Sequence, residues 1–285
     1  ALVGAVYASG GLQDFKEAVL KLDRKKVISM LDLVFPKCGL LDGKKVTDFF
    51  QPFVSKDDFR HLSIPMAVTA TDLHTSREAW LMRGSVIQAV RASIAVPGLF
   101  TPVLVNDRLM VDGGLVNPLP VNLVRSMGAD VVIAVDLNHY MNMRGSSMSG
   151  QAESGAKLCP EDESGTKSDL NEEKNGIFPG IMDRLGRMDI PWFDSFKNWK
   201  NKPVGPNIFE IIFASTLVME KTITDLNLER EPADLLVRPN LGKVRFMDFH
   251  RAKESIAQGA QACARVLEDN GSILDRLTSR LLPEA

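Results

Sequence analysis

The sequence contains little cysteine and no long apolar run. Its cysteines are odd in number and have no spacing typical of a metal site or a disulfide framework: Cys38, Cys159 and Cys263. A reducing compartment is therefore expected, and we predict a cytoplasmic protein that could also lie at the periphery of a membrane. No run of 18 or more apolar residues occurs, which excludes a candidate membrane-spanning helix from this sequence.

A strong charge of one sign and the common phosphate-binding motifs are also missing. Lys and Arg number 34 against 36 Asp and Glu, and no basic run exceeds a few residues, so nucleic acid is not expected as a partner. Neither G-x-x-x-x-G-K-[ST] nor G-x-G-x-x-G occurs, which argues against nucleotide binding. No His/Cys/Asp cluster has the spacing of metal ligands. We therefore expect no metal and no cofactor.

What the sequence does contain is the pattern of a globular protein. Its 285 residues, 45% of them apolar, fit one large domain over 1–285 that buries about three quarters of its unfolded surface. Apolar residues at helical spacing fill 1–53, with Asp42-Gly43 as a turn into the last helix there. Extended segments follow at 66–71, 79–82, 103–106, 108–111, 131–135 and 233–239. Further helices are expected at 121–127, from 208 to about 226 with one buried face, and from Asp248 to about 268.

The run at 131–135 decides the predicted fold class. It is continuously apolar and flanked by helices, which is typical of a parallel strand covered on both faces. The segment 233–239 has the same character. The segments 103–106 and 108–111 differ, because a tight turn at Asp107 would pair them as a hairpin. We predict an α/β fold: a three-layer α/β/α domain with a mainly parallel central sheet.

The segment 91–120, RASIAVPGLFTPVLVNDRLMVDGGLVNPLP, is the most informative part of the chain. A strand ending at Asp112 would bring its carboxylate to a turn, and Gly113 and Gly114 permit positive φ or a close backbone approach. Ser85 has the character of a helix N-cap, and small side chains at the end of that helix would let another segment pack closely. Spacing alone favours a simple Asp-Gly turn over a catalytic site.

These residues resemble a known family. RASxAxPGxFxPV followed by VDGGLVNPLP is similar to the patatin-like phospholipase family, specifically its bacterial branch. The resemblance continues through 121–137 and back to 1–10, ALVGAVYASG, which is similar to the helix after that family's G-x-S-x-G nucleophile elbow; only about 138–205 falls outside it. In that family the Asp of DGG is the base of a Ser-Asp dyad that hydrolyses lipid acyl esters. The resemblance implies this role for Asp112.

The sequence departs from the family at the nucleophile. No Gly has Ser two residues on and Gly four residues on, and the family's Gly-rich oxyanion loop is absent as well. Ser9 is followed by Gly11, but Tyr7 stands at the first glycine position, so we interpret Ser9 as a helix C-terminus. The resemblance therefore implies an N-terminally incomplete domain whose serine lies upstream of Ala1, so that the chain by itself is inactive.

Other polar residues offer alternatives to Asp112. In the α/β-hydrolase order of Ser, Asp and His, His250 could serve as the base of a triad. The local sequence Asp248-Phe249-His250 is more typical of a capped helix start at the surface. Asp72 and Asp136 both end strands and could line one edge of a sheet, but each is more simply a cap or turn residue.

The stretch after the predicted strand 131–135 changes composition twice. Residues 138–180 are rich in Ser, Gly, Glu, Lys, Asp and Asn, which predicts a mobile surface insertion. In 181–200, aromatic and apolar residues alternate with Lys and Arg, which suits either a water–lipid boundary or a lid packed on its own domain. The candidates for lipid contact are Trp192, Phe193, Phe196 and Trp199.

Two functions follow from the sequence. The first is a lipid acyl-ester hydrolase, a phospholipase or lysophospholipase, with Asp112 as the base of a Ser-Asp dyad. The second is a non-catalytic lipid-binding or regulatory protein with the same fold. A lipid or a membrane surface is the expected partner in both.

Overall fold

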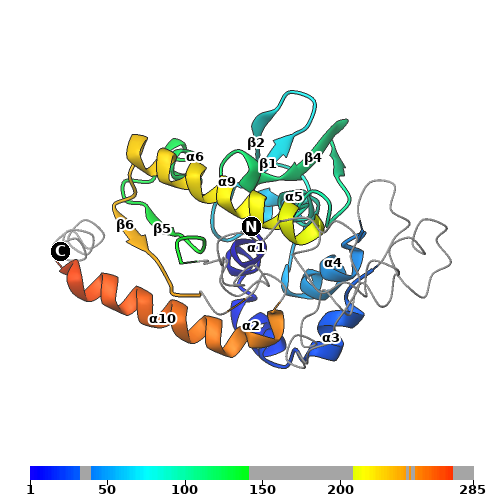
Figure 1. Cartoon of the computed structure of the whole chain (residues 1–285), viewed down its shortest axis with the longest axis horizontal. Coiled ribbons are helices and arrows are strands. Elements are labelled where there is room, and N and C mark those ends of the chain that lie inside the picture. The colour runs from blue at the N-terminus through cyan, green and yellow to red at the C-terminus, as the bar shows by residue number, and fades with distance from the viewer. Residues whose placement is uncertain (33–39, 141–207, 242–243, 245–247, 272–285) are drawn as a thin grey trace, which may run out of the picture.

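The computed structural model describes residues 1–32, 40–140, 208–241, 244 and 248–271 (Figure 1). The chain begins with short helices: α1 (Leu2–Ala8), α2 (Leu12–Leu20), α3 (Arg24–Ser29) and α4 (Lys44–Phe50). Gly43 has a φ of 78° directly before α4, so the predicted turn at Asp42-Gly43 is confirmed. The ring of Phe50 is fully buried among these helices. The 3₁₀ turns η1 (Gln51–Phe53) and η2 (Phe59–His61) then lead to the first sheet.

The first sheet has four strands, all antiparallel. They are β1 (Val68–Asp72), β2 (Arg77–Leu81), β3 (Val103–Val105) and β4 (Arg108–Asp112), in the spatial order β2-β1-β4-β3. The prediction of a mainly parallel central sheet is therefore wrong for these strands. For the pairs β1–β2 and β3–β4, the reason is the length of the connections: residues 73–76 and 106–107 make tight turns, whereas a parallel pair needs a crossover of a dozen or more residues.

A second, separate pair of strands is parallel. It consists of β5 (Ile133–Val135), which follows α6 (Val121–Ser126), and β6 (Leu235–Val237), with Ile133 opposite Leu235. This confirms the parallel pairing expected for these two apolar runs. Coverage on both faces is not seen in the described part, where Ile133 and Val135 are about half exposed.

Helix α5 (Val86–Ser93) packs on the four-stranded sheet. Its N-cap is confirmed, because the Ser85 hydroxyl accepts a hydrogen bond of 3.0 Å from the Gln88 N–H. Val90 and Ala92 are completely buried, and such a valine contributes about 1.5–3 kcal/mol through burial. The small side chains let the main chain of β4 approach, as expected: the N–H of Asp112 donates to the carbonyl of Ala95 at 3.1 Å.

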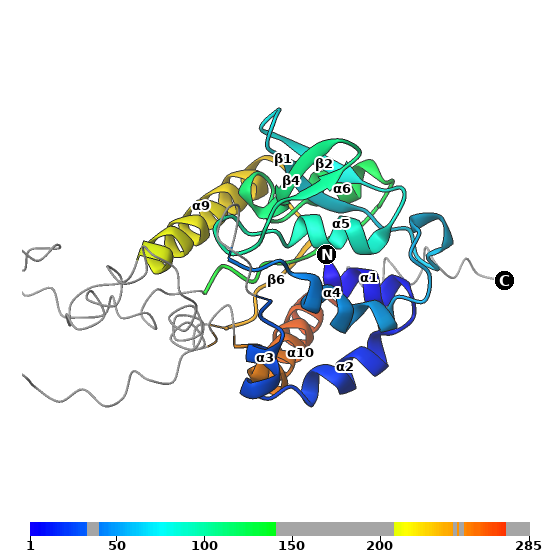
Figure 2. The ribbon, with the colours of Figure 1, turned by 90° about the vertical axis from the view of Figure 1, so that its right-hand side faces the viewer.

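Two long helices complete the described chain. Figure 1 shows α9 (Ile208–Arg230) running across the molecule from β6 to α5 and α10 (Ala252–Asp269) lying below β6; in Figure 2, α10 is beside α3 and near α2. Both helices were predicted, but α9 does not bury its apolar side chains as expected. Ile211 and Val218 are exposed, whereas Ala214, Thr216 and Thr224 are buried. Thr216 satisfies its hydroxyl on the carbonyl of Ile212, at 3.1 Å.

The described elements define an α/β protein. In the described ranges, no helix has both the length and the apolar character needed to cross a membrane. Most of the predicted insertion at 138–180, and the whole aromatic segment 181–200 with its four lipid-contact candidates, lie outside the described residues.

Candidate active site

The DGG sequence forms a turn at the end of β4. Asp112 begins the 3₁₀ turn η3 (Gly113–Leu115), and its side chain accepts a hydrogen bond of 2.7 Å from the N–H of Gly114. The main chain of Asp112 is fixed on both sides: its N–H bonds Ala95, and its carbonyl accepts a 2.7 Å hydrogen bond from the hydroxyl of Thr71. The carboxylate therefore projects from a backbone with little freedom to move.

Neither glycine has a positive φ, and Gly113 is needed for a close approach to the backbone. A Cβ on Gly113 would lie 2.5 Å from the main-chain oxygen of Thr69. A Cβ on Gly114 would lie 2.9 Å from Oε1 of Glu220 and 3.1 Å from Oδ1 of Asp112. Real Cβ atoms do not come so close to backbone oxygen, so the prediction that this turn permits close backbone approach is confirmed.

The Asp112 carboxyl group has an unusual pKa. Burial raises the pKa to about 6, while the hydrogen bond from Gly114 opposes this rise. An ordinary Asp has a pKa near ~3.9 and is a weak base. A carboxylate with a pKa near neutrality accepts a proton more readily, which is the property of a general base.

An open cavity of about 820 Å³ lies in front of Asp112. Its walls are mostly apolar and come from α1, α2, α5 and α9, with Val3, Phe15, Val19, Ile94, Phe213 and Leu217 among them. The polar groups that line it include Asp112, Asn117, Asn138 and Glu220. An apolar cavity with a few convergent polar groups is typical of a small-molecule binding site.

The N-terminus of α1 lies at the same cavity. Ala1 lines it together with Asp112. Ser9 is at the opposite end of α1, which spans 7 residues and so about 10 Å. Ser9 is the C-cap residue of this helix and does not line the cavity, which agrees with its interpretation as a helix C-terminus.

Glu220 of α9 is the second carboxyl group at the cavity. One of its oxygens, Oε2, accepts a 3.0 Å hydrogen bond from the side-chain amide of Asn138. Burial raises the pKa of Glu220 to about 7; the negative charge of Asp112 adds to this rise, and the bond from Asn138 opposes it. Two acidic groups with raised pKa values thus share one cavity.

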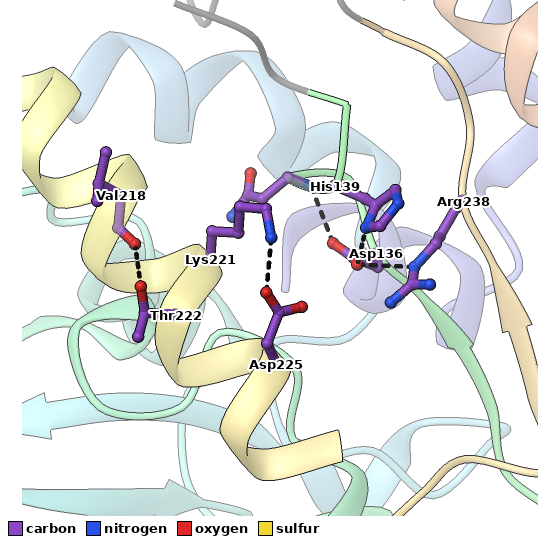
Figure 3. Close-up of polar contacts among 8 residues, drawn as sticks. Asp136, His139, Val218, Lys221, Thr222, Asp225 and Arg238 are labelled. Atoms are coloured by element: carbon purple, nitrogen blue, oxygen red, sulfur yellow. Dashed lines mark hydrogen bonds and ion pairs between the residues drawn. The ribbon is translucent and has the colours of Figure 1, made fainter. Parts of the chain in front are cut away.

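Asn138 connects Glu220 to a further polar cluster at the end of β5. Its main-chain N–H donates to Oδ1 of the buried Asp136 at 3.1 Å, and Arg238 donates to Oδ2 of the same carboxylate at 3.2 Å (Figure 3). The ring of His139 lies on the same side, with Nδ1 3.9 Å from Oδ2 of Asp136. Asp136 is therefore a turn residue paired with Arg238, which agrees with the simpler of its two interpretations.

Asn117 holds the DGG turn against other parts of the chain. Its side-chain N–H groups donate to Glu78 of β2 and to Asn122 of α6, both at 2.8 Å. Its side-chain oxygen accepts a 3.3 Å hydrogen bond from Asn227 of α9. This buried amide therefore links the segment after Gly114 to the sheet and to α9.

The alternative candidates do not line the cavity: they are His250, Asp72 and Asp136. Nε2 of His250 accepts a 3.2 Å hydrogen bond from Arg24 of α3, and His250 does not line the cavity although its neighbours Asp248 and Phe249 do. Asp72 accepts hydrogen bonds from the main-chain N–H groups of His74 and Thr75, as expected for a turn residue. Asp248 precedes its helix as predicted, but no side-chain capping bond to that helix is formed.

Glu220, Asn138 and Asn117 could not be singled out from the sequence. Glu220 lies on a helix whose pattern is mostly apolar, and no local motif relates it to a turn more than a hundred residues earlier. Asn138 begins a stretch whose composition indicates an insertion, and Asn117 precedes a proline in a segment typical of a helix start. For metals, the described residues contain no group of three or more His, Cys, Asp or Glu side chains that could hold an ion.

The fold and cavity together define an α/β protein with a partly buried pair of carboxyl groups, both with raised pKa values, in a mostly apolar site. Comparison with known proteins is more specific. Residues 1–125 match the family model described as patatin-like phospholipase. The resemblance noted from the sequence is confirmed for these residues, which are similar to the patatin-like phospholipase family.

Individual relatives agree with this assignment. An uncharacterized NTE family protein of Mycobacterium tuberculosis is 28% identical over 293 residues, which cover 94% of this chain and 81% of that protein. A Caenorhabditis elegans protein named for a patatin-like phospholipase domain is 30% identical over 53% of this chain and 15% of its own length. Patatin-like phospholipase domain-containing protein 7 of Mus musculus is 32% identical over 38% of this chain and 8% of its own length. At the level of the family, the chain is thus related to carboxylic-ester hydrolases that act on lipids.

Proposed function

We propose that Asp112 is the general base of a Ser-Asp dyad that hydrolyses acyl esters of lipids. The observation that carries this proposal is the position of its carboxyl group: it is partly buried, has a raised pKa and opens into a large apolar cavity. The nucleophilic serine, on this proposal, belongs to the segment that precedes Ala1. The proximity of Ala1 to Asp112 supports it, because residues leading into α1 enter the structure beside this carboxylate.

The chemistry follows from this arrangement. The Asp112 carboxylate accepts the proton of the serine hydroxyl while the serine oxygen attacks the ester carbonyl of the lipid. The protonated Asp112 then returns this proton to the departing alcohol, which leaves an acyl-serine and an ionised Asp112. In the second half, Asp112 removes a proton from water, which attacks the acyl-serine. Asp112 then returns this proton to the serine oxygen as the acyl–oxygen bond breaks and the fatty acid is released.

The apolar walls of the cavity support a lipid substrate. Val3, Phe15 and Phe213 are not suited to a sugar or a peptide backbone, whereas an acyl chain gains ~0.8 kcal/mol for each CH₂ group that leaves water. We further propose that the aromatic segment 181–200 contacts the lipid surface. These contacts would place the ester at the cavity without a membrane-spanning helix.

The upstream coding sequence gives the first test. A G-x-S-x-G motif directly before Ala1 supports the hydrolase, and its absence supports the non-catalytic lipid-binding alternative. The 285-residue chain alone should then hydrolyse no ester, and Ser9→Ala should change nothing. Serine-dependent turnover of a p-nitrophenyl ester by this chain would contradict the proposed position of the nucleophile.

The second test uses a chain extended through that motif. Asp112→Asn keeps the size of the side chain and the bond from Gly114, but Asn cannot take up the serine proton. We expect hydrolysis of a p-nitrophenyl ester to fall by about 10²–10⁴-fold. His250→Ala serves as the control and should retain activity. Melting curves of both variants exclude unfolding, and the reverse result would favour a Ser-His-Asp triad.

A further inference from the structure

Glu220 faces Asp112 across the main chain of Gly114. A Cβ on Gly114 would be within 3.1 Å of both Oε1 of Glu220 and Oδ1 of Asp112, so both oxygens lie next to the same point beside Gly114. A side chain at this position would crowd both carboxyl groups. Asn138 orients Glu220 from the other side through the 3.0 Å bond to Oε2. Glu220 is thus held at the site of Asp112 by contacts from two separate segments.

The two carboxyl groups receive unequal support for a negative charge. Asp112 accepts a short hydrogen bond of 2.7 Å from the Gly114 N–H, which favours its ionised form. Glu220 receives one amide hydrogen bond from Asn138, and the charge of Asp112 opposes its ionisation. The negative charge of Asp112 raises the pKa of Glu220, and the hydrogen bond from Gly114 favours ionisation of Asp112 first.

The charged groups around Glu220 do not remove this difference in ionisation between Asp112 and Glu220. On its own helix, Lys221 forms an ion pair of 2.6 Å with Asp225 (Figure 3). Beyond Asn138, Asp136 is paired with Arg238. The other charged or titratable groups that line the cavity or adjoin these pairs are Ala1, Lys16, His139 and Asp248. Within the described residues, no Lys or Arg side chain forms an ion pair with Glu220 or with Asp112.

We propose that Glu220 is a positioning residue that keeps its proton while Asp112 is ionised, so that the site carries a single negative charge. This inference rests on the proposed function and adds a regulation of the same site by pH. A second negative charge beside Asp112 would oppose the oxyanion that forms when serine attacks the ester carbonyl. Ionisation of Glu220 therefore switches the site off as pH rises, without any proton transfer from Glu220 to the substrate.

The first experiment needs no activity. The 285-residue chain is labelled with ¹³C at the aspartate carboxyl carbons, the Asp112 signal is assigned by its loss in Asp112→Asn, and the signal is followed from pH 4 to 9. In the unsubstituted protein we expect two steps, the ionisation of Asp112 and a second change as Glu220 ionises. In Glu220→Gln the second step should disappear. An Asp112 titration that is the same in both proteins would overturn the inference.

Two further variants guard against a structural artefact. Asn138→Ala removes the hydrogen bond that favours ionised Glu220, so the second step should move to higher pH while the first stays nearly in place. Glu229→Gln changes the same charge on an exposed part of α9 and should leave both steps unchanged. If Glu220→Gln does not fold, the shift of the second titration step in Asn138→Ala tests the proposal instead. A shift of this step to lower pH contradicts the proposal.

The second experiment uses the extended, active chain. The rate of ester hydrolysis should rise with pH as Asp112 ionises and fall again as Glu220 ionises. Glu220→Gln should lose the fall at high pH and keep the rise at low pH, whereas a purely structural role would lower the rate at every pH. If the extended protein hydrolyses no ester, the proposed function fails while the carboxyl titration still tests the pairing. If it is active and the two titrations are identical, only the role of Glu220 is refuted.

Discussion

The hydroxyl of Thr71 donates a hydrogen bond of 2.7 Å to the main-chain carbonyl of Asp112. The bond joins the two central strands of the four-stranded sheet at the point where β4 ends. It is a side-chain contact to the backbone, so it positions Asp112 without touching its carboxylate. The geometry of the acidic turn thus depends on a residue more than forty positions earlier in the chain.

We expect Thr71→Val to destabilise the fold, because Val has the shape of Thr but cannot donate this bond. The free energy of unfolding should fall by about 1 kcal/mol, the usual net value of one such hydrogen bond. Thr71→Ser keeps the hydroxyl group and is the matched variant. Urea denaturation measures the free energy of unfolding of both variants. A Thr71→Val variant as stable as the unsubstituted protein would show that this bond does not stabilise the fold.

Gly113→Ala should be much more damaging than an ordinary Gly-to-Ala change. The new methyl group would meet the main-chain oxygen of Thr69 at 2.5 Å, and the backbone must move to relieve the contact. The expected loss of stability is about 1–3 kcal/mol or more. A methyl group on Gly259 of α10 would meet nothing within 4 Å, so Gly259→Ala should instead stabilise its helix by about 0.5–1 kcal/mol. Thermal denaturation of the two variants distinguishes these opposite effects.

The raised pKa of Asp112 should make stability depend on pH in a definite direction. Its folded-state pKa of about 6 lies above the ~3.9 of an unfolded chain, so the folded protein holds this proton more tightly. The free energy of unfolding therefore decreases as pH rises from about 4 to about 6, by an amount of up to ~3 kcal/mol for this group.

Asp112→Asn removes that dependence. Relative to the unsubstituted protein, the variant should gain stability between pH 4.5 and pH 7, as measured by urea denaturation at each pH. Other groups titrate equally in both proteins, so the difference between them isolates Asp112 and the neighbouring Glu220. A difference that is constant with pH would show that Asp112 has an ordinary pKa.

The aromatic segment gives a prediction about lipid contact. Trp80 lies on β2, so Trp80→Phe leaves Trp192 and Trp199 as the only tryptophans in the sequence. In this background, anionic phospholipid vesicles should shift the tryptophan emission to the blue, and Trp192→Ala should weaken vesicle binding. An unchanged spectrum at saturating lipid would favour a lid packed on its own domain.

Local features of the fold could be predicted from the sequence, and long-range ones could not. The Ser85 cap, the turn at Asp42-Gly43 and the strand ending at Asp112 depend on residues within a few positions of one another. The pairing of β1 with β4 does not, because these two strands are separated by more than thirty residues and no local motif relates them. The continuous apolar character of 131–135 correctly predicted a parallel strand. The prediction of parallel pairing fails for the strands of the four-stranded sheet.

The candidate site divides in the same way. Asp112, Gly113 and Gly114 are adjacent in sequence, and their family resemblance singled them out. Glu220 reaches the cavity only because α9 crosses above the DGG turn, and that crossing is a property of the folded chain (Figure 1). A lone Glu on a helix of mostly apolar residues is typical of a solvated side chain until its surroundings are known.

The parallel pairing of β5 with β6 places Ile133 opposite Leu235, residues separated by about a third of the chain. The entropic cost of closing such a loop grows only with the logarithm of its length, and doubling the length costs about 0.6 kcal/mol. The turns at 73–76 and 106–107 are different, because one added residue would move each strand's side chains to the opposite face of the sheet. Evolution can therefore lengthen or shorten the connection between β5 and α9 at small thermodynamic cost, while the hairpin that delivers Asp112 must keep its length.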